Sequence, residues 1–207
     1  MKKKRGFEIC KGYEKKDIHM PMRKTKNSAG YDFEAAEDTV IPSFWKSVFA
    51  NIKNVFKSSN VSEDYKPTLV KTGIKAYCGE DEVLILANRS SNPAKKGLIL
   101  ANSIGVIDAD YYGNKENDGN IMYAFYNFFP FDITIKKHDV IGQAYFQNFL
   151  IVDNDAELSS KATRQGGFGS TSKKATAKAK TTKKVKTASK ATTKAKTSSK
   201  AKSTKKK

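Results

Sequence analysis

The sequence has little cysteine and little histidine. Cys10 and Cys78 are its two cysteines, and without a paired spacing they provide no disulfide framework. Two histidines in 207 residues leave little for a zinc site. We therefore expect a chain that folds without covalent or zinc cross-links in a reducing, intracellular compartment.

Long apolar runs are also missing. No stretch of about 18 apolar residues occurs, and the basic residues at 2–5 are not followed by the apolar core of a signal peptide. The sequence therefore predicts a protein that is neither secreted nor membrane-spanning. A chain of 207 residues has room for one domain of ordinary size with tails.

Acidic residues are absent from the C-terminal end, where residues 172–207 contain 15 lysines. Without those lysines and the four basic residues at 2–5, 20 basic residues face 21 acidic ones, so the formal charge of +18 belongs to the ends. The tail, 173–207, is built from Lys, Ala, Thr and Ser and cannot bury a core, so we expect it to be disordered. It either solubilises the protein or binds nucleic acid through phosphate contacts that release counterions. The second alternative would place the protein in the nucleus or near DNA.

Short β-rich runs broken by Gly, Asn, Asp or Pro dominate the sequence after Lys66. They predict an all-β sandwich or barrel over residues 21–163, preceded by a segment, 1–20, with the basic start and a first strand. Residues 43–58 differ, because their apolar side chains recur at three-and-four spacing. This pattern predicts one inserted amphipathic helix, which either packs on the protein's own body or binds a partner.

Five short blocks combine glycine with charged, hydroxyl or aromatic residues. They are AGYDF at 29–33, RSS at 89–91, GVIDADYYG at 105–113, DVIGQ at 139–143 and RQGGFGST at 164–171. The last block suits phosphate, because exposed N–H groups and hydroxyls can donate while Arg164 supplies a bidentate fork. Phe168 would then be available to stack on a base. Taken alone, the same block fits a glycine-rich linker equally well.

The third block contains two aspartates, Asp108 and Asp110, separated by one residue. On an extended strand both carboxylates would point to the same face, where a pair can raise one pKa or hold a metal-bound water for general-base catalysis. Asp-x-Asp before Tyr-Tyr-Gly is equally often simple turn chemistry.

In this order and at these spacings, the five blocks resemble the five motifs of the trimeric dUTPase family. The resemblance covers about 21–172 apart from the helical insert. It implies a distorted jelly-roll β-barrel that forms a homotrimer, hydrolyses dUTP to dUMP and pyrophosphate with Mg²⁺, and shares each active site between subunits. Such an activity limits uracil incorporation into DNA and supplies dUMP for dTTP synthesis.

The resemblance also implies roles for individual residues. Asp108 matches the general base that deprotonates the attacking water, and Tyr111 the ring that underlies the deoxyribose and excludes a 2′-hydroxyl. Asp32 would hold water in the magnesium shell. Uracil would be bound by the hairpin that contains Asn102, Gly105 and Ile107, under the ring of Phe168. The residues facing the phosphates would be Arg89, Ser90, Ser91, Gln143, Arg164, Gly169, Ser170 and Thr171, the last four in the lid at 164–172.

The chain departs from the family pattern at several positions. The usual proline before Arg89 is Asn88, the usual glycine after Ser90 is Ser91, and the fourth motif contains His138, Val140 and Gly142. Because these changes lie in motifs that would contact the phosphates, the resemblance does not define the details of those contacts. His138 is interpreted as a turn residue, and the stretch 114–120 has no counterpart and no assigned function.

Two alternatives remain open. A dCTP deaminase shares the fold and much of the motif set, but that branch has a catalytic glutamate where this chain has Ala124. A non-catalytic nucleic-acid-binding protein on the same fold would not need Asp108, Tyr111 and a complete lid. The aromatic run from Tyr123 to Phe131 could stack on nucleic acid, but in a β-barrel we expect it in the core and at subunit contacts.

Overall fold

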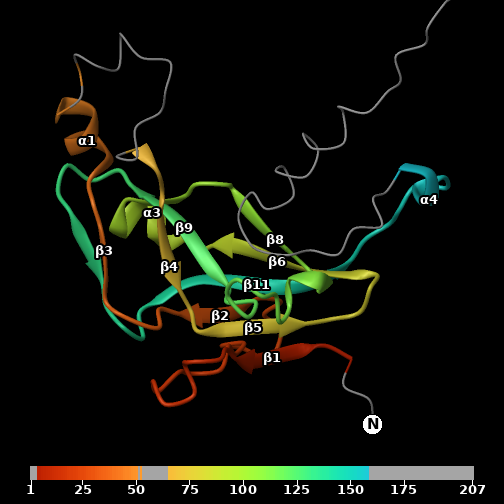
Figure 1. The fold of residues 1–207 in the computed structure, drawn as a ribbon. Coiled ribbons are helices and arrows are strands. Elements are labelled where there is room, and N and C mark those ends of the chain that lie inside the picture. The colour runs from red at the N-terminus through yellow and green to blue at the C-terminus, as the bar shows by residue number, and fades with distance from the viewer. Residues whose placement is uncertain (1–3, 51, 53–64, 159–207) are drawn as a thin grey trace, which may run out of the picture. The chain divides into compact units, whose positions relative to one another are not determined.

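The computed structural model describes residues 4–50, 52 and 65–158 (Figure 1). Its strands are β1 Gly6–Ile9, β2 Tyr31–Glu34, β3 Thr39–Ile41, β4 Thr68–Lys71, β5 Ile74–Tyr77, β6 Glu82–Asn88, β7 Leu98–Leu100, β8 Ile104–Asp108, β9 Met122–Asn127, β10 Ile133–Ile135 and β11 Val140–Asn148. Its helices are α1 Phe44–Ala50, α3 Ser91–Lys96 and α4 Asp155–Leu158, with a 3₁₀ turn η2 at Ala109–Tyr111. Within the described residues no helix is long and apolar enough to cross a membrane.

The described strands pair antiparallel in four small sheets. The largest has the order β2-β11-β6-β8, the next is β4-β9-β7, and β1-β5 and β10-β3 form two pairs. Neighbours in these sheets come from distant parts of the chain, since β11 lies between β2 and β6. Antiparallel sheets with long crossovers and few helices are the architecture of jelly-roll-like proteins. The all-β prediction is confirmed.

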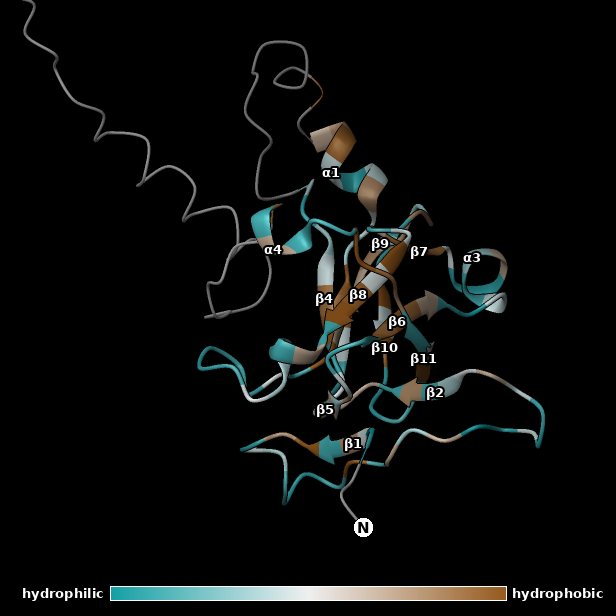
Figure 2. Ribbon diagram, turned by 90° about the vertical axis from the view of Figure 1, so that its right-hand side faces the viewer, coloured by the Kyte–Doolittle hydropathy of each residue, from teal (hydrophilic) through white to brown (hydrophobic). Residues whose placement is uncertain are grey.

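The core lies between the inward faces of these sheets. On β7 and β8 the more buried side chains alternate with exposed ones, as a half-buried strand requires, whereas β6 begins with three buried residues in a row. Figure 2 shows the hydrophobic colour concentrated on the central strands, while the connecting loops are largely hydrophilic. The largest side chains that are fully buried are Phe33, Ile41, Ile74, Leu84, Leu98, Ile121, Tyr123, Phe125, Ile135 and Ile141.

The aromatic run divides between core and surface. Tyr123 and Phe125 are fully buried and stacked, as predicted for a barrel. The expected subunit contact is not tested by a single chain, in which Phe128 and Phe131 are exposed and not in the core. The two rings are exposed because β9 ends at Asn127, where side-chain bonds from Asn127 Nδ2 to the carbonyls of Ile41 and Phe131 turn the chain out of the sheet.

The predicted helix is confirmed as α1 over Phe44–Ala50, while residues 53–58 lie outside the described part. Its first turn contacts the rest of the domain: the ring of Phe44 stacks on Phe128, and Trp45 Nε1 donates to the Phe128 carbonyl at 3.0 Å. The helix nevertheless buries no residue, and Phe49 is 67% exposed. Among the described residues, its contacts with the body of the protein come from this first turn.

Candidate active site

Two of the five blocks meet at the β2-β11 pair. Asp32 on β2 lies directly opposite Gln143 on β11, which in turn lies opposite Ala87 near the end of β6. Gln143 Nε2 donates to the Asn88 carbonyl at 3.4 Å, and Arg89 follows immediately. Residues opposite one another on neighbouring strands share a face, so Asp32 and Gln143 project to the same, outward side. The fold thus brings the first, second and fourth blocks together.

Asn88, a departure from the family pattern, organises the loop that contains Arg89, Ser90 and Ser91. Its Nδ2 donates to the Leu98 carbonyl at 3.0 Å. Its Oδ1 accepts from Arg89 N at 2.9 Å and from Asn92 Nδ2 at 2.7 Å. Asn92 is buried and also donates to the Ile141 carbonyl at 2.8 Å. Sequence reasoning missed these two asparagines, because their role depends on partners on β7 and β11 that no local motif reveals.

Gly142, another departure, is explained by Tyr123. A Cβ at position 142 would lie 2.0 Å from Tyr123 Cε1, so only glycine lets the two strands approach this closely. The Tyr123 hydroxyl donates to the Gln143 carbonyl at 2.9 Å. Burial, with the nearby charge of Asp32, raises the pKa of Tyr123 well above its ordinary value, so this hydroxyl stays protonated. The departure therefore fixes the backbone that positions Gln143.

The third block forms β8 and the turn before it. Asn102 lies in the tight connection after β7, where Ile104 N donates to its carbonyl. Gly105 and Ile107 face the core, and a Cβ at Gly105 would come within 2.9 Å of Leu86 Cδ1. Any contact of these two residues with a ligand would therefore use their backbone groups. Since β8 is the edge of its sheet, alternate N–H and C=O groups point away from β6.

Asp108 is the last residue of β8 and lies opposite Val83 on β6. Its side chain is exposed on the outward face, where Ile104 and Val106 are 51% and 53% exposed. The expectation that strand alternation pairs it with Asp110 is not met, because the 3₁₀ turn begins at Ala109 and ends the alternation. The structure instead contains a turn at this position, which is the alternative that the sequence offered for Asp108 and Asp110.

Tyr111 is held by the stretch 114–120, to which the sequence assigned no function. The tyrosine is 5% exposed, and its hydroxyl donates to the Asn120 carbonyl at 3.0 Å. That hydroxyl also accepts from Asn117 Nδ2 at 2.8 Å, while Asn114 Nδ2 donates to the Tyr111 carbonyl at 2.8 Å. The loop thus clamps both ends of Tyr111 and fixes the orientation of its ring.

The loop is anchored in turn by Asp118. Its Oδ2 accepts from Lys75 Nζ and from Lys11 N, both at 2.8 Å, and the Lys75 and Asp118 side chains are only 11% and 15% exposed. Burial alone would raise the pKa of Asp118, but the bonds from Lys75 and Lys11 outweigh it and lower that pKa.

We predict that Asp118→Asn lowers the free energy of unfolding by roughly 1–3 kcal/mol at neutral pH, because the buried Lys75 charge loses its partner. Pairing lowers the pKa of Asp118 in the folded state. Its stabilisation is therefore complete above the unfolded value of about 3.9 and is lost as pH falls through the folded pKa. Urea unfolding of both proteins should show a gap at pH 7 that narrows below about pH 4. An equal gap at both pH values would contradict the assignment.

Within one chain, the group formed by Asp32, Gln143 and Arg89 does not meet the group formed by Asp108 and Tyr111. Gln143 and Ala87 are level with Ile104, whereas Asp108 lies four residues further along β8, roughly 13 Å by strand rise. Two depressions, of about 380 and 560 Å³, are lined by none of the predicted site residues. The predicted lid residues Arg164, Phe168, Gly169, Ser170 and Thr171 lie outside the described residues.

Comparisons with known proteins show which family this chain resembles in sequence and fold. The dUTPase family model matches residues 55–172. The chain is 41% identical to a deoxyuridine 5'-triphosphate nucleotidohydrolase from Lactococcus lactis over 167 residues, which cover 81% of this chain and 97% of the relative. A crystal structure of dUTPase from Streptococcus mutans aligns with TM-score 0.59 and 37% identity, covering 72% of this chain and 98% of that one.

A mutant dUTPase from phage phi11 of S. aureus, described with a structural Mg(II) ion, aligns with TM-score 0.52 at 17% identity. It covers 73% of this chain and 94% of its own, and shows likeness of fold. With the family model and the Lactococcus relative covering most of the described strands, the chain belongs to the dUTPase family.

Proposed function

We propose that the chain hydrolyses dUTP to dUMP and pyrophosphate, with Asp108 as the general base. The observation that supports this is the placement of an exposed carboxylate at the outward end of an edge strand, three residues before a clamped aromatic ring. A water between Asp108 and the α-phosphorus attacks that phosphorus while its proton passes to the carboxylate. The bond to the bridging oxygen then breaks and pyrophosphate leaves.

Tyr111 and the edge of β8 bind the nucleoside in this proposal. Because loop 114–120 holds the Tyr111 ring at both ends, the ring cannot move aside for a 2′-hydroxyl. Uracil is recognised by backbone groups between Asn102 and Ile107, a set of donors and acceptors that side-chain changes leave intact. Phe168 covers the base from the lid.

In this proposal the phosphates lie against the group that contains Arg89, Asp32 and Gln143. Arg89 offers a bidentate fork and the hydroxyls of Ser90 and Ser91 are close beside it on the same loop. The residues near Asp32 fit Mg²⁺, because they offer a carboxylate and the Gln143 amide oxygen on one outward face. A bound Mg²⁺, kept largely by water and phosphate oxygens, would neutralise charge on the triphosphate. Arg164, Gly169, Ser170 and Thr171 close over the terminal phosphates.

The active site is shared between subunits of a homotrimer. In one chain Asp108 is separated from the row of Asp32 and Gln143, and both lie on an outward face with exposed apolar residues between them. Burying Ile104 and Val106 against another copy would remove that apolar surface from water. In the proposed trimer, the Arg89 that serves Asp108 comes from such a neighbouring copy. Leu150, Ile151 and Val152, all strongly exposed after β11, offer further apolar contact area.

A nucleotide panel tests the activity. dUTP should yield pyrophosphate, whereas dCTP, dTTP and UTP should yield little. Ammonia release from dCTP would instead indicate the deaminase. The structure favours the first outcome, since Ala124 is a buried apolar residue on β9, without the carboxylate that deamination would use there.

The basic tail, 173–207, is proposed to bind nucleic acid without sequence preference and so to hold the enzyme near DNA. Its 15 lysines carry no acidic neighbours. We predict that truncation after Ser172 leaves kcat unchanged but abolishes retardation of duplex DNA in a gel. Retardation by the full chain should weaken with salt at a slope of roughly −0.9 per phosphate neutralised. Equal, salt-insensitive migration with both proteins would reduce the tail to a solubilising appendage.

A further inference from the structure

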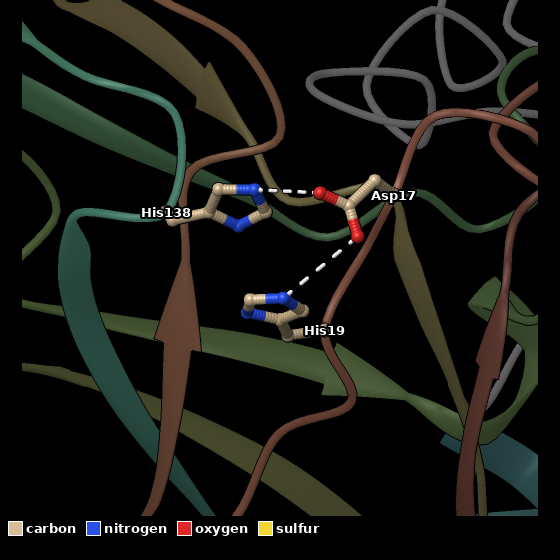
Figure 3. Close-up of side chains that lie close together, drawn as sticks. All are labelled: Asp17, His19 and His138. Carbon is tan, nitrogen blue, oxygen red and sulfur yellow. Dashed lines mark hydrogen bonds and ion pairs between the residues drawn. The ribbon is translucent and has the colours of Figure 1, made fainter.

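The two histidines of the chain, far apart in sequence, lie against each other on the surface. His19 belongs to the segment before β2, and His138 to the turn before β11. Their rings stack with centroids 4.2 Å apart and an interplanar angle of 20°. Figure 3 shows both rings directed at the carboxylate of Asp17.

Two carboxylates contact the ring pair from opposite sides. Glu34 Oε2 lies 2.8 Å from His19 Nδ1 and 3.3 Å from His138 Nδ1. Asp17 Oδ2 lies 3.1 Å from His138 Nε2, and Asp17 Oδ1 lies 3.9 Å from His19 Nε2. Both Nδ1 atoms therefore face Glu34, and both Nε2 atoms face Asp17.

The tautomers of the two histidines decide which ring nitrogens can accept a metal ion. A neutral imidazole has one N–H, and an ionised carboxylate only accepts. If each Nδ1–H donates to Glu34, both Nε2 lone pairs point toward the Asp17 oxygens, which also carry lone pairs. In that tautomer a cation between the Nε2 atoms and Asp17 would be coordinated from both sides, whereas the tautomer with His138 Nε2–H donating to Asp17 satisfies this contact without a metal.

We propose that Asp17, His19 and His138 form a surface Zn²⁺ site. Two imidazole nitrogens and one carboxylate oxygen are a usual zinc ligand set, leaving a fourth position for water. Glu34 behaves as the outer carboxylate that fixes the tautomer of metal-binding histidines. Substrate Mg²⁺ is a different ion, because Mg²⁺ prefers oxygen ligands alone.

The ligand atoms lie within 4.8 Å of one another, whereas tetrahedral zinc needs them about 3.3 Å apart. The site therefore closes by side-chain rotation, which is available because the side chains of Asp17 and His19 are 72% and 54% exposed. Lys137 Nζ lies 3.6 Å from Asp17 Oδ2 and opposes a dication. The expected affinity is therefore moderate, with a dissociation constant in the micromolar range.

The position of the site gives zinc a structural consequence. Glu34 ends β2 two residues after Asp32, and His138 precedes β11, which contains Gln143. Zinc would tie the segment at 17–19 to the ends of this strand pair. It should therefore raise the melting temperature of the chain by a few degrees at saturating metal, because it binds the folded state only.

The test uses full-length, untagged protein freed of metal by a chelator and titrated with ZnCl₂ by calorimetry. One Zn²⁺ per chain should bind. The double variant His19→Gln/His138→Asn should lose this binding and the thermal shift, and asparagine suits position 138 because its φ is +68°. Glu34→Gln should weaken binding about tenfold, and Lys137→Gln should tighten it.

Cys78→Ser is the matched control, because a half-buried thiol is the other soft ligand in the described residues that zinc could reach. It should leave the zinc affinity unchanged. Co²⁺ in place of Zn²⁺ should give the visible absorption bands of a four-coordinate ion in wild-type protein and not in the double variant. Equal zinc affinity of wild type and double variant, or no binding at submillimolar ZnCl₂, would overturn the proposal.

Discussion

Asp108→Asn is expected to lower kcat for dUTP by about 10³-fold while leaving substrate affinity within a few-fold of wild type. The amide keeps the shape of the carboxylate but cannot accept the proton of the attacking water. Asp108 is exposed at the end of β8, so the fold should tolerate the change. Steady-state pyrophosphate release measures kcat, and calorimetry with the non-hydrolysable α,β-imido analogue of dUTP measures binding.

Asp110→Asn is the control for this experiment. Asp110 has the same chemistry two residues away, but it belongs to the 3₁₀ turn and does not share the strand geometry of Asp108. We expect a kcat within a few-fold of wild type. If the two variants lose activity equally, the paired-carboxylate interpretation would be restored. If Asp108→Asn keeps near wild-type kcat, Asp108 is not the base.

The types of secondary structure could be predicted from local patterns, because strands, turns and helices each have a characteristic spacing of apolar and turn-forming residues. Short β-rich runs broken by turn residues predicted the all-β class, and three-and-four spacing predicted the helix that begins at Phe44. The sheet order could not be predicted, because pairing of β11 with both β2 and β6 depends on contacts more than 50 residues apart. The division of the aromatic run, with Tyr123 and Phe125 in the core and Phe128 and Phe131 exposed, depends on such distant contacts too.

The candidate site could be predicted where the residues of one short motif are enough to suggest a role, as for Asp108 and Tyr111. It was not predictable where a residue acts through distant partners. Asn117 and Asn120 hold Tyr111, but in the sequence they belong to a polar loop with no recognisable pattern. His138 looked like a turn residue, which it is by its positive φ, and only the fold places it on His19.

A shared active site predicts that two inactive variants restore each other. Arg89→Ala removes the phosphate fork and Asp108→Asn removes the base, so each should be nearly inactive alone. In one chain these residues belong to separate groups, because the loop after β6 that contains Arg89 and the end of β8 lie at opposite ends of the β6-β8 pair. If each site takes Arg89 from one subunit and Asp108 from the next, a mixed oligomer contains a site with both intact residues.

The measurement uses the two variants co-expressed with different affinity tags and purified in tandem, so that every oligomer contains both. A closed ring of three subunits with head-to-tail interfaces has one fully intact site whichever variant is in the majority, so the rate should recover to about one third of wild type. Mixing the purified variants without subunit exchange should give no recovery. Recovery to about one half would indicate a dimer. Absence of recovery in a confirmed mixed oligomer would show that Arg89 and Asp108 act within the same chain, and that the outward face containing Ile104 and Val106 serves another purpose.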